Sequence, residues 1–153
     1  MPDDYASDLI ERTNQVLQRC IAELAPAIRK GALPRTPQDH AKATWLFKRT
    51  REDGRIDFGE PADHVYRLIR AASRPYPGAF TVHGDCEMIV WRGRSAPAPE
   101  RSGQPGEIVD IQPGQGLLVQ TGRGQLWLTE LQYVGRPGPS DLGAFQVGQM
   151  LGP

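Results

Sequence analysis

The sequence has few of the features that mark secreted, membrane-spanning or strongly charged proteins. Its 153 residues include two cysteines, Cys20 and Cys86, too few and too far apart for a disulfide framework or a zinc site. Eighteen basic and eighteen acidic side chains cancel, so no overall field draws the protein to nucleic acid or to an anionic membrane. No apolar run approaches the roughly 20 residues that span a bilayer. The acidic N-terminus does not resemble a signal peptide. A cytoplasmic location without a membrane partner is predicted.

Glycine and proline are plentiful by contrast, with 17 and 14 residues. This abundance favours short strands joined by turns over long helices. The predicted fold class is α+β: an N-terminal helix and an extended linker, then a short helix and a small antiparallel OB-like β-barrel. The predicted domain limits are 1–31 for the helix, 32–57 for the linker and 58–153 for the barrel domain.

The N-terminal helix is predicted from Asp8 to Lys30, with a kink or break near Ala25 because Pro26 removes an interior hydrogen bond. Apolar side chains recur along it at helical spacing and form one stripe. This stripe needs a covering surface: the β-domain, another copy of the chain, or another protein. Its members are Leu9, Val16, Leu17, Cys20, Ile21, Leu24 and Ile28.

The linker has no sustained periodicity, and Pro34 and Pro37 keep its first part extended. Trp45, Leu46 and Phe47 interrupt its polar run. We predict that the linker lies on the domain surface and that these three apolar side chains hold it there.

A short amphipathic helix carrying Val65 and Ile69 is predicted next, and Pro75 and Pro77 end it. Five strands follow, at 79–83, 86–92, 107–112, 117–121 and 125–131. The tail is predicted to attach to the barrel through apolar side chains, which are Phe145, Val147, Met150 and Leu151.

Several segments in this order resemble a known family. These are Leu33-Pro-Arg-Thr-Pro-Gln-Asp39 with Ala43-Thr44, then Glu52-Asp-Gly-Arg-Ile-Asp-Phe58, then Arg74-Pro-Tyr-Pro-Gly-Ala-Phe-Thr81. Together they resemble the linker and C-terminal domain of folate-dependent formyltransferases, a superfamily that includes methionyl-tRNA formyltransferase and sugar-nucleotide N-formyltransferases. The resemblance extends from about Asp8 to Leu131, and it also implies an OB-like barrel.

The resemblance implies that the chemistry lies elsewhere. Enzymes of this family react through an Asn, a His and an Asp in an N-terminal Rossmann-like domain, which also binds formyl-tetrahydrofolate. The segments that carry those residues, a His-x-Ser-Leu-Leu-Pro-like run and a following Asp-x-Gly, do not occur here in that context. No catalytic residue and no cofactor are therefore assigned to this chain. The N-terminal helix resembles the last helix of that domain, whose apolar face packs on a sheet, and the chain is expected to be inactive alone, as a fragment or a separately encoded piece.

The other titratable clusters point more readily to structure than to catalysis. His64 has Asp63 and Glu60 nearby, but carboxylates at a helix start more often interact with the helix dipole. Surface or locally bonded imidazoles are therefore favoured over a general base for His40, His64 and His83. An acidic cluster near the short helix is a candidate general acid or metal site, but turn and helix-start carboxylates are favoured, because no His or Cys stands at ligand spacing. The cluster consists of Asp53, Asp57, Glu60 and Asp63.

A basic group is the candidate substrate-binding site, because guanidinium and ammonium groups bind phosphate. Arg67, Arg70 and Arg74 follow one helix face and its exit, and solvated intramolecular ion pairs are the alternative explanation for them. The residues assigned to substrate binding are Lys48, Arg49, Arg51, Arg70, Arg74 and Tyr76.

The barrel itself is predicted to be net acidic, which favours a small-molecule acceptor over tRNA. Trp91 and Trp127 both alternate with apolar strand residues, so each is either an exposed stacking surface or a covered side chain. The charges from 79 to 131 are Arg92, Arg94, Arg101 and Arg123 against Asp85, Glu87, Glu100, Glu107, Asp110 and Glu130.

Two functions of different classes follow. The first is a C-terminal substrate-positioning domain of a formyltransferase that uses formyl-tetrahydrofolate. The second is a free-standing, non-catalytic interaction module that docks a catalytic domain, another partner or a second copy through its N-terminal helix. An RNA-binding OB module is a less favoured third, and it would show a steep salt dependence.

Overall fold

The computed structural model of this chain describes residues 3–33, 35–97 and 103–152. The chain contacts divide it into two compact units, of which the first comprises residues 1–7 and 50–153 and the second residues 8–49. These limits differ from the predicted ones at 31 and 57, because residues 3–7 and 50–57 pack with the β-domain. Glu100 and Arg101, counted among the barrel charges above, and Pro34 lie outside the described residues.

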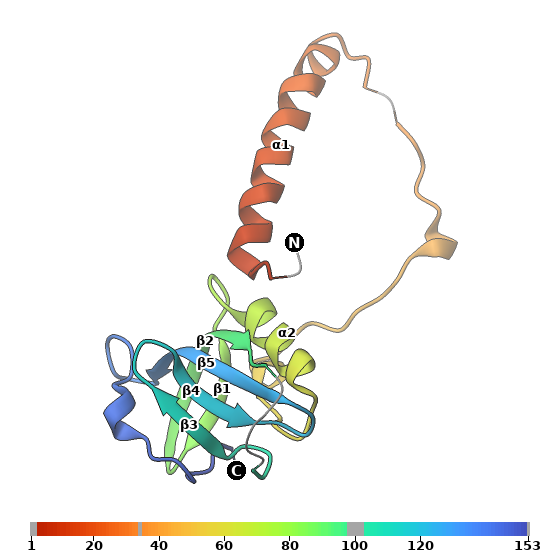
Figure 1. Cartoon of the computed structure of the whole chain (residues 1–153). Helices are drawn as coiled ribbons and strands as arrows, with labels where there is room; N and C mark the ends of the chain where they lie inside the picture. The colour runs from red at the N-terminus through yellow and green to blue at the C-terminus, as the bar shows by residue number, and fades with distance from the viewer. Residues whose placement is uncertain (1–2, 34, 98–102, 153) are drawn as a thin grey trace. The chain divides into compact units, whose positions relative to one another are not determined.

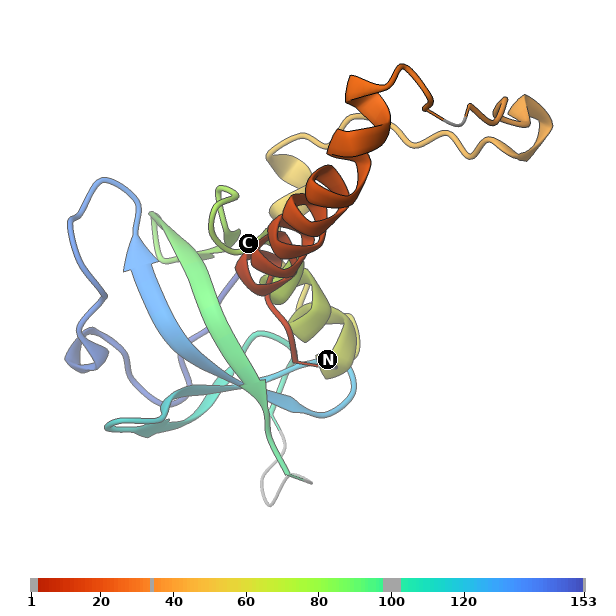
Figure 2. The ribbon, with the colours of Figure 1, turned by 90° about the horizontal axis from the view of Figure 1, so that it is seen from above.

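The first unit is built on a five-stranded antiparallel sheet with the order β1-β2-β5-β4-β3 (Figure 1). Each pair that is consecutive in the sequence is joined by a tight turn, except β2 and β3. Figure 2 shows how strongly the sheet twists. The sheet with its helices confirms the α+β class, whereas the OB-like description of the barrel stays a prediction. The strands are β1 (Ala79–His83), β2 (Cys86–Ser95), β3 (Ile108–Gln112), β4 (Gly116–Gln120) and β5 (Gln125–Tyr133).

The C-terminal tail is hydrogen-bonded to both outer strands of the sheet. Leu151 forms an isolated bridge with His83 at the end of β1, and Met150 forms one with Glu107 beside β3. Phe145 and Leu151 are buried in the core, as predicted for the tail. Val147 and Met150, predicted to anchor it as well, are exposed instead, because the bridging backbone alternates its side chains between core and solvent.

The helix α2 (Ala62–Ala72) covers the core of this unit. Val65 and Ile69 are 2% and 0% exposed, and they pack against inward side chains of the sheet such as Val90 and Leu126. Pro61 stands immediately before the helix, where its missing N–H costs no hydrogen bond. The helix ends at Ala72, two residues before Arg74, as the prolines predict.

Residues 3–7 join this unit although they include the first two residues of the N-terminal helix, which begins at Ala6. The Tyr5 hydroxyl donates to the Gly93 carbonyl at 2.9 Å and accepts from the Gly93 N–H at 3.1 Å. Tyr66 donates to the Asp3 carboxylate at 3.2 Å, and Arg70 donates to the Asp4 carbonyl at 2.9 Å. A short N-terminal segment is therefore part of the β-domain.

The second unit contains most of α1 (Ala6–Arg29) and the extended segment that follows it, with the short 3₁₀ turn η1 (His40–Lys42). The helix continues through Pro26, so of the predicted kink or break the break is wrong and the kink stays a prediction. Hydrogen bonds such as Lys30 N–H to the Pro26 carbonyl at 3.2 Å sustain the helix here. Among the described residues, no helix is long and apolar enough to cross a membrane.

Two groups of apolar side chains in this unit are exposed. The large apolar residues of the α1 stripe are 43% to 64% exposed, so the second unit by itself does not cover the stripe. Trp45, Leu46 and Phe47 are 89%, 94% and 101% exposed, so no residue of their own unit covers them. That they hold the linker on the β-domain stays a prediction.

Candidate functional site

An irregularity in β2 places two consecutive side chains outside the core. The pairing of β2 with β5 shifts register on both sides of Arg92, which is typical of a β-bulge. Met88 and Val90 point inward and are fully buried, whereas Trp91 and Arg92 both lie on the outer side. Bulges re-aim side chains in this way near functional sites.

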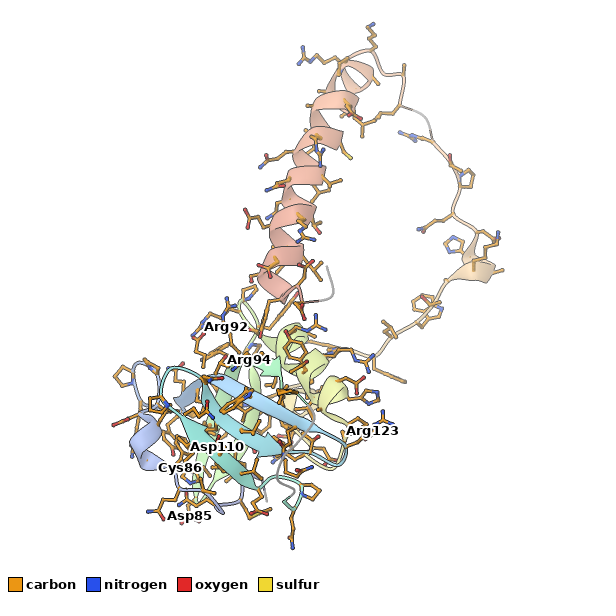
Figure 3. All side chains as sticks on the ribbon, in the orientation of Figure 1. Asp85, Cys86, Arg92, Arg94, Asp110 and Arg123 are labelled. Carbon is orange, nitrogen blue, oxygen red and sulfur yellow. The ribbon has the colours of Figure 1, made fainter. Side chains whose placement is uncertain are left out.

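Three arginines lie over aromatic rings on this outer side. The Arg74 guanidinium is 4.0 Å from the Trp91 ring centroid, and that of Arg92 is 4.8 Å from the ring of Tyr5. Arg94 lies 5.4 Å from the ring of Trp127. Figure 3 labels Arg92 and Arg94 on β2. We call this surface the arginine–aromatic face; it consists of Arg74, Trp91, Arg92, Arg94, Trp127 and Glu130, with Tyr5 beneath Arg92.

Glu130 organises the charges of the arginine–aromatic face. Its carboxylate accepts from Arg74 at 2.7 Å and lies 3.5 Å from Arg92. Arg94 bonds instead to the neutral Gln115 side chain. Three guanidinium groups thus face one carboxylate, which leaves the face cationic and suited to an anionic group such as a phosphate. Its one carboxylate, Glu130, is engaged by Arg74 and Arg92, and none of the residues that make up the face is a histidine.

The six predicted substrate-binding residues do not form one site within the β-domain. Lys48 and Arg49 belong to the second unit. Arg51 is paired with Glu87. Arg70 is turned toward the N-terminal segment and Tyr66, and its Nε is buried without a partner. Only Arg74 joins the arginine–aromatic face. Tyr76, in the turn after α2, is exposed and points to no described partner. The assignment of these residues to substrate binding stays a prediction.

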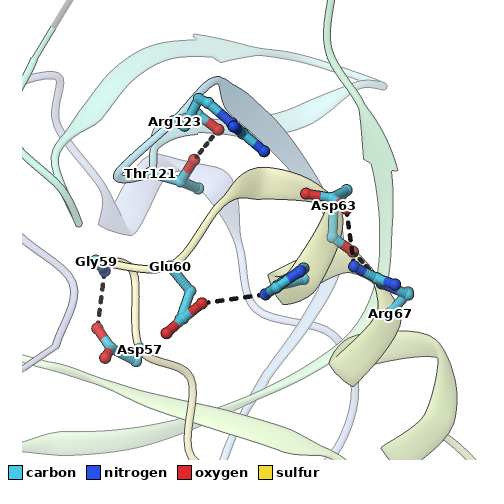
Figure 4. A network of polar contacts seen from close by, with 8 residues as sticks. Asp57, Gly59, Glu60, Asp63, Arg67, Thr121 and Arg123 are labelled. Atoms are coloured by element: carbon cyan, nitrogen blue, oxygen red, sulfur yellow. Dashed lines mark hydrogen bonds and ion pairs between the residues drawn. The ribbon is translucent and has the colours of Figure 1, made fainter.

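The acidic cluster has structural partners, which Figure 4 shows in part. Asp57 accepts from the Gly59 N–H at 2.8 Å, and Glu60 lies 3.1 Å from a ring nitrogen of His64. Asp63 pairs with Arg67 one helical turn later at 2.8 Å. These are the turn and helix-start roles that the sequence favoured. Among the residues that the structure describes, no three His, Cys, Asp or Glu side chains gather as metal ligands.

The same turn packs closely against the β4–β5 connection. Gly122 N–H donates to the Phe58 carbonyl at 2.7 Å, and a Cβ at Gly122 would lie 1.9 Å from the Gly59 carbonyl oxygen. Thr121 donates its hydroxyl to the Arg123 carbonyl at 3.0 Å and fixes the hairpin end (Figure 4). At this corner of the domain the backbones of the two turns are therefore in close contact.

His83 also has a local structural role. Both ring nitrogens of His83 are bonded, one to the Tyr133 hydroxyl at 2.6 Å and one to Gln149 at 3.1 Å, so the ring ties β1 to β5 and the tail. Burial raises the pKa of Tyr133 above its usual value. Burial, with Tyr5 and Asp3 acting in the same direction, raises the pKa of Tyr66 to about 12. Both tyrosines therefore stay neutral donors at physiological pH.

The two tryptophans of the sheet are shielded from solvent, Trp127 almost wholly and Trp91 in part. Trp127 is only 5% exposed, so it offers no free ring for stacking. Trp91 is half-buried, with Arg74 over one ring face and its indole N–H donated to Gln132 at 2.8 Å. Arg74 lies over the ring of Trp91 and Arg94 over the ring of Trp127, so an arginine covers each ring in part.

Sequence reasoning missed Arg92, Arg94 and Tyr5 as partners in one surface. Strict strand alternation would put Trp91 and Arg92 on opposite sides, and only the bulge brings them to one side. The glycine at 93, unusual in a strand interior, was the available signal for a bulge. Nothing in the sequence links Tyr5 to a strand 88 residues later.

One protein family matches more than half of this chain. The family model "Formyl transferase, C-terminal domain" matches residues 48–138. Solved structures of HypX from Aquifex aeolicus are similar in fold. One substituted variant is 22% identical over 94% of this chain and 26% of that chain, with a TM-score of 0.72. A second variant is 23% identical over 90% and 24%, with a TM-score of 0.69.

A third HypX structure, in complex with tetrahydrofolic acid, is 22% identical over 82% of this chain and 22% of that chain, with a TM-score of 0.64. At these identities the likeness establishes the fold. This chain spans about a quarter of the length of the HypX chains that it matches.

Proposed function

Because the chain belongs to the formyl transferase C-terminal domain family, we propose that it is the substrate-positioning domain of a formyltransferase that uses formyl-tetrahydrofolate. In this division of labour a catalytic domain binds the folate and transfers the formyl group. This chain holds the molecule that carries the acceptor amine. The cofactor is therefore assigned to the catalytic domain, and this chain is inactive alone. A similar HypX structure contains tetrahydrofolic acid, which supports folate chemistry in related proteins.

The observation that carries the proposal is the uncovered apolar stripe of α1. Six large apolar side chains of one helix are exposed, and contiguous apolar surface of this kind marks an interaction site. The resemblance assigns this helix to the catalytic domain, where it packs on a sheet. The catalytic domain is accordingly the partner that we propose for the stripe.

The arginine–aromatic face supports a small acceptor that bears a phosphate. Arg94 has a neutral partner, and Arg74 and Arg92 share a single carboxylate, so an added anion gains charge-assisted hydrogen bonds. The zero net charge of the chain favours such a local contact over the many phosphate contacts of tRNA.

The test is reconstitution. The purified chain is expected to show no formyl transfer from formyl-tetrahydrofolate, and addition of a formyltransferase catalytic domain from the same organism is expected to restore transfer or raise its rate. The double variant Leu17→Glu with Ile21→Glu places two charges in the stripe. It is expected to abolish the formyl transfer that the added catalytic domain restores. The matched control, Gln15→Glu with Gln18→Glu, adds the same charge on the opposite helix face and is expected to leave it unchanged.

The interaction-module alternative makes a different prediction from the same stripe. A chain that self-associates through α1 would sediment as a dimer, and the Leu17→Glu/Ile21→Glu variant would sediment as a monomer. Formyl transfer by the purified chain alone would contradict the proposed division of labour. Tight, steeply salt-dependent binding of mixed tRNA would contradict the small acceptor.

A further inference from the structure

Two guanidinium groups of the arginine–aromatic face are stacked flat on aromatic rings. Arg92 lies over Tyr5 and Arg94 over Trp127, and all four residues belong to the first unit. A guanidinium donates its hydrogen bonds from the edge of its plane. A contact through the face of the plane therefore orients the group and leaves its N–H donors for an acceptor.

The two arginines are neighbours on one side of β2. Gly93, the residue between them, is buried, whereas neither arginine is. Residues two apart on a strand point to the same side, and their Cα atoms are about 7 Å apart. Figure 3 labels both arginines at the same end of the strand. One tetrahedral oxyanion placed between them is therefore able to accept from both guanidinium groups.

A chain of neutral side chains holds Arg94. Its guanidinium donates to the Gln115 side-chain oxygen, and Gln115 donates in turn to the Gln112 side-chain oxygen at 2.6 Å. Gln112 donates to the Asp110 carboxylate at 2.7 Å. This chain directs the guanidinium without neutralising it, because the group that touches it is an uncharged amide. The Asp110 carboxylate belongs to β3, three strand spacings or about 14 Å along the sheet from β2, where salt largely screens its charge.

Arg92 has a charged partner, but a loose one. The two carboxylate oxygens of Glu130 are divided between two arginines, with Oε1 at 2.7 Å from Arg74 and Oε2 at 3.5 Å from Arg92. A partly exposed ion pair of this length contributes little stability. A stronger anion is therefore able to take Arg92 from Glu130 while Glu130 keeps its shorter contact with Arg74.

The charge of the face indicates which kind of phosphate it fits. Three guanidinium groups and one carboxylate give a net charge of +2. A phosphomonoester carries about −1.5 to −2 at pH 7 and offers three acceptor oxygens. A phosphodiester, such as each link of a nucleic-acid backbone, carries a single negative charge. A monoester therefore neutralises the face and has enough oxygens for both arginines, whereas a diester leaves one guanidinium uncompensated.

We infer that Arg92 and Arg94 bind a terminal phosphate, as a phosphomonoester. Glu130 is the counter-ion that this phosphate displaces from Arg92, and Gln115 is the positioning residue of Arg94. The inference rests on the proposed function and deepens it, because it takes the phosphate to belong to the acceptor molecule. It restricts that molecule to acceptors with a terminal phosphate, as distinct from those whose phosphates are all diesters.

The experiment uses two isosteric substitutions that change the charge of the face in opposite directions. Glu130→Gln removes the competing carboxylate, and Gln115→Glu neutralises Arg94 without removing it. The probe is methyl phosphate, titrated at low salt into the full, isotope-labelled chain, and binding is measured from the NMR shifts of the backbone amides at 92–94. Glu130→Gln is expected to lower the Kd about threefold to tenfold, and Gln115→Glu is expected to raise it by a similar factor.

A second probe tests the preference for a terminal phosphate. Dimethyl phosphate has the same methyl group but is a diester, and we expect it to bind about tenfold more weakly than methyl phosphate. Methyl phosphate that binds no more tightly than dimethyl phosphate overturns the assignment to a monoester.

Matched controls change the charge of the chain by the same amounts away from the face. Asp85→Asn lies in the turn before β2, at the opposite end of that strand from Arg92, as Figure 3 shows. Gln146→Glu lies on an exposed position of the C-terminal tail. Both are expected to leave the Kd for methyl phosphate within about twofold of the unsubstituted chain. Controls that shift it as much as Glu130→Gln and Gln115→Glu overturn the site, because binding then follows the overall charge.

The remaining outcomes separate this inference from the proposed function. A Glu130→Gln variant that binds methyl phosphate more weakly overturns the displacement of Glu130. No saturable binding of methyl phosphate, together with successful reconstitution of formyl transfer, overturns the phosphate site and leaves the proposed function standing. Saturable binding with the expected charge dependence, together with failed reconstitution, overturns the proposed function and leaves the phosphate site standing. The amide spectrum of each variant shows directly whether it is folded.

Discussion

The two helices of this protein have the same kind of sequence pattern and opposite surroundings. α1 is 24 residues long and α2 is 11, and each carries an apolar stripe at helical spacing. In α2 the stripe residue Ile69 is fully buried against the sheet, whereas in α1 the stripe residue Ile21 is 64% exposed. The pattern predicts which face of a helix packs against another surface. Whether that surface belongs to the same chain depends on the rest of the fold.

This difference assigns different roles to equivalent residues. A buried apolar residue of α2 stabilises the β-domain by the transfer of its side chain from water and by close packing. An exposed apolar residue of α1 does not stabilise the free chain in this way. Its transfer from water can stabilise only a complex with a partner. Stability and binding should therefore respond separately to substitutions in the two helices.

The largest expected effect is at Ile69. Ile69→Ala leaves a cavity in a fully buried site, and we expect the free energy of unfolding to fall by about 3–4 kcal/mol. Ile21→Ala, the same change in α1, should alter it by less than about 0.5 kcal/mol. Urea unfolding followed by the fluorescence of buried Trp127 measures both. Equal losses of unfolding free energy for the two variants would contradict the difference in burial between Ile69 and Ile21.

Gly122→Ala should be the next most damaging change. The added Cβ would meet the Gly59 carbonyl oxygen at 1.9 Å, so the two backbones must separate, at an expected cost of about 2–3 kcal/mol. Gly31, in the second unit, has a positive φ of 64° but no atom within 4 Å of a built Cβ. Gly31→Ala should therefore cost only local strain and leave the unfolding midpoint of the β-domain unchanged. A tolerated alanine at 122 would rule out the close approach.

Tyr5→Phe tests the assignment of residues 3–7 to the β-domain. It removes a buried hydroxyl that both donates to and accepts from Gly93, and we expect a loss of about 1–1.5 kcal/mol in the same urea measurement. Thr13→Val removes an exposed hydroxyl that donates to the Leu9 carbonyl within α1, and should have little effect. If Tyr5→Phe is neutral, the N-terminal segment does not stabilise the β-domain.

The smallest expected effect has the opposite sign. The Thr81 hydroxyl in β1 is buried without a hydrogen-bond partner, so Thr81→Val should raise the free energy of unfolding by about 1 kcal/mol. Thr129→Val, on an exposed position of β5, serves as the control and should change little. A destabilised Thr81→Val variant would indicate that the hydroxyl has a partner after all.

Much of the fold was predictable because its signals are local. Pro75 and Pro77 end α2, alternation identifies Leu126 and Leu128 as inward-facing, and Gly84-Asp85 marks the β1–β2 turn. The family was also predictable, because the Glu52–Phe58 and Arg74–Thr81 segments carry it in order. The candidate site was not: of the residues assigned to it, only Arg74 lies on the arginine–aromatic face. That face depends on a bulge at Arg92 and on Tyr5, which the sequence separates by 87 positions.

The sequence by itself determined the elements, their inward faces and the family, because periodicity, prolines and turn residues act over a few neighbouring positions. Tertiary structure decided which apolar faces are covered and which charges are paired. Burial depends on what packs against a residue from distant parts of the chain: α2 lies on the sheet, whereas the second unit by itself covers neither the α1 stripe nor Trp45, Leu46 and Phe47. For the same reason Trp127, which alternation leaves outside the core, is buried, and Trp45 is not.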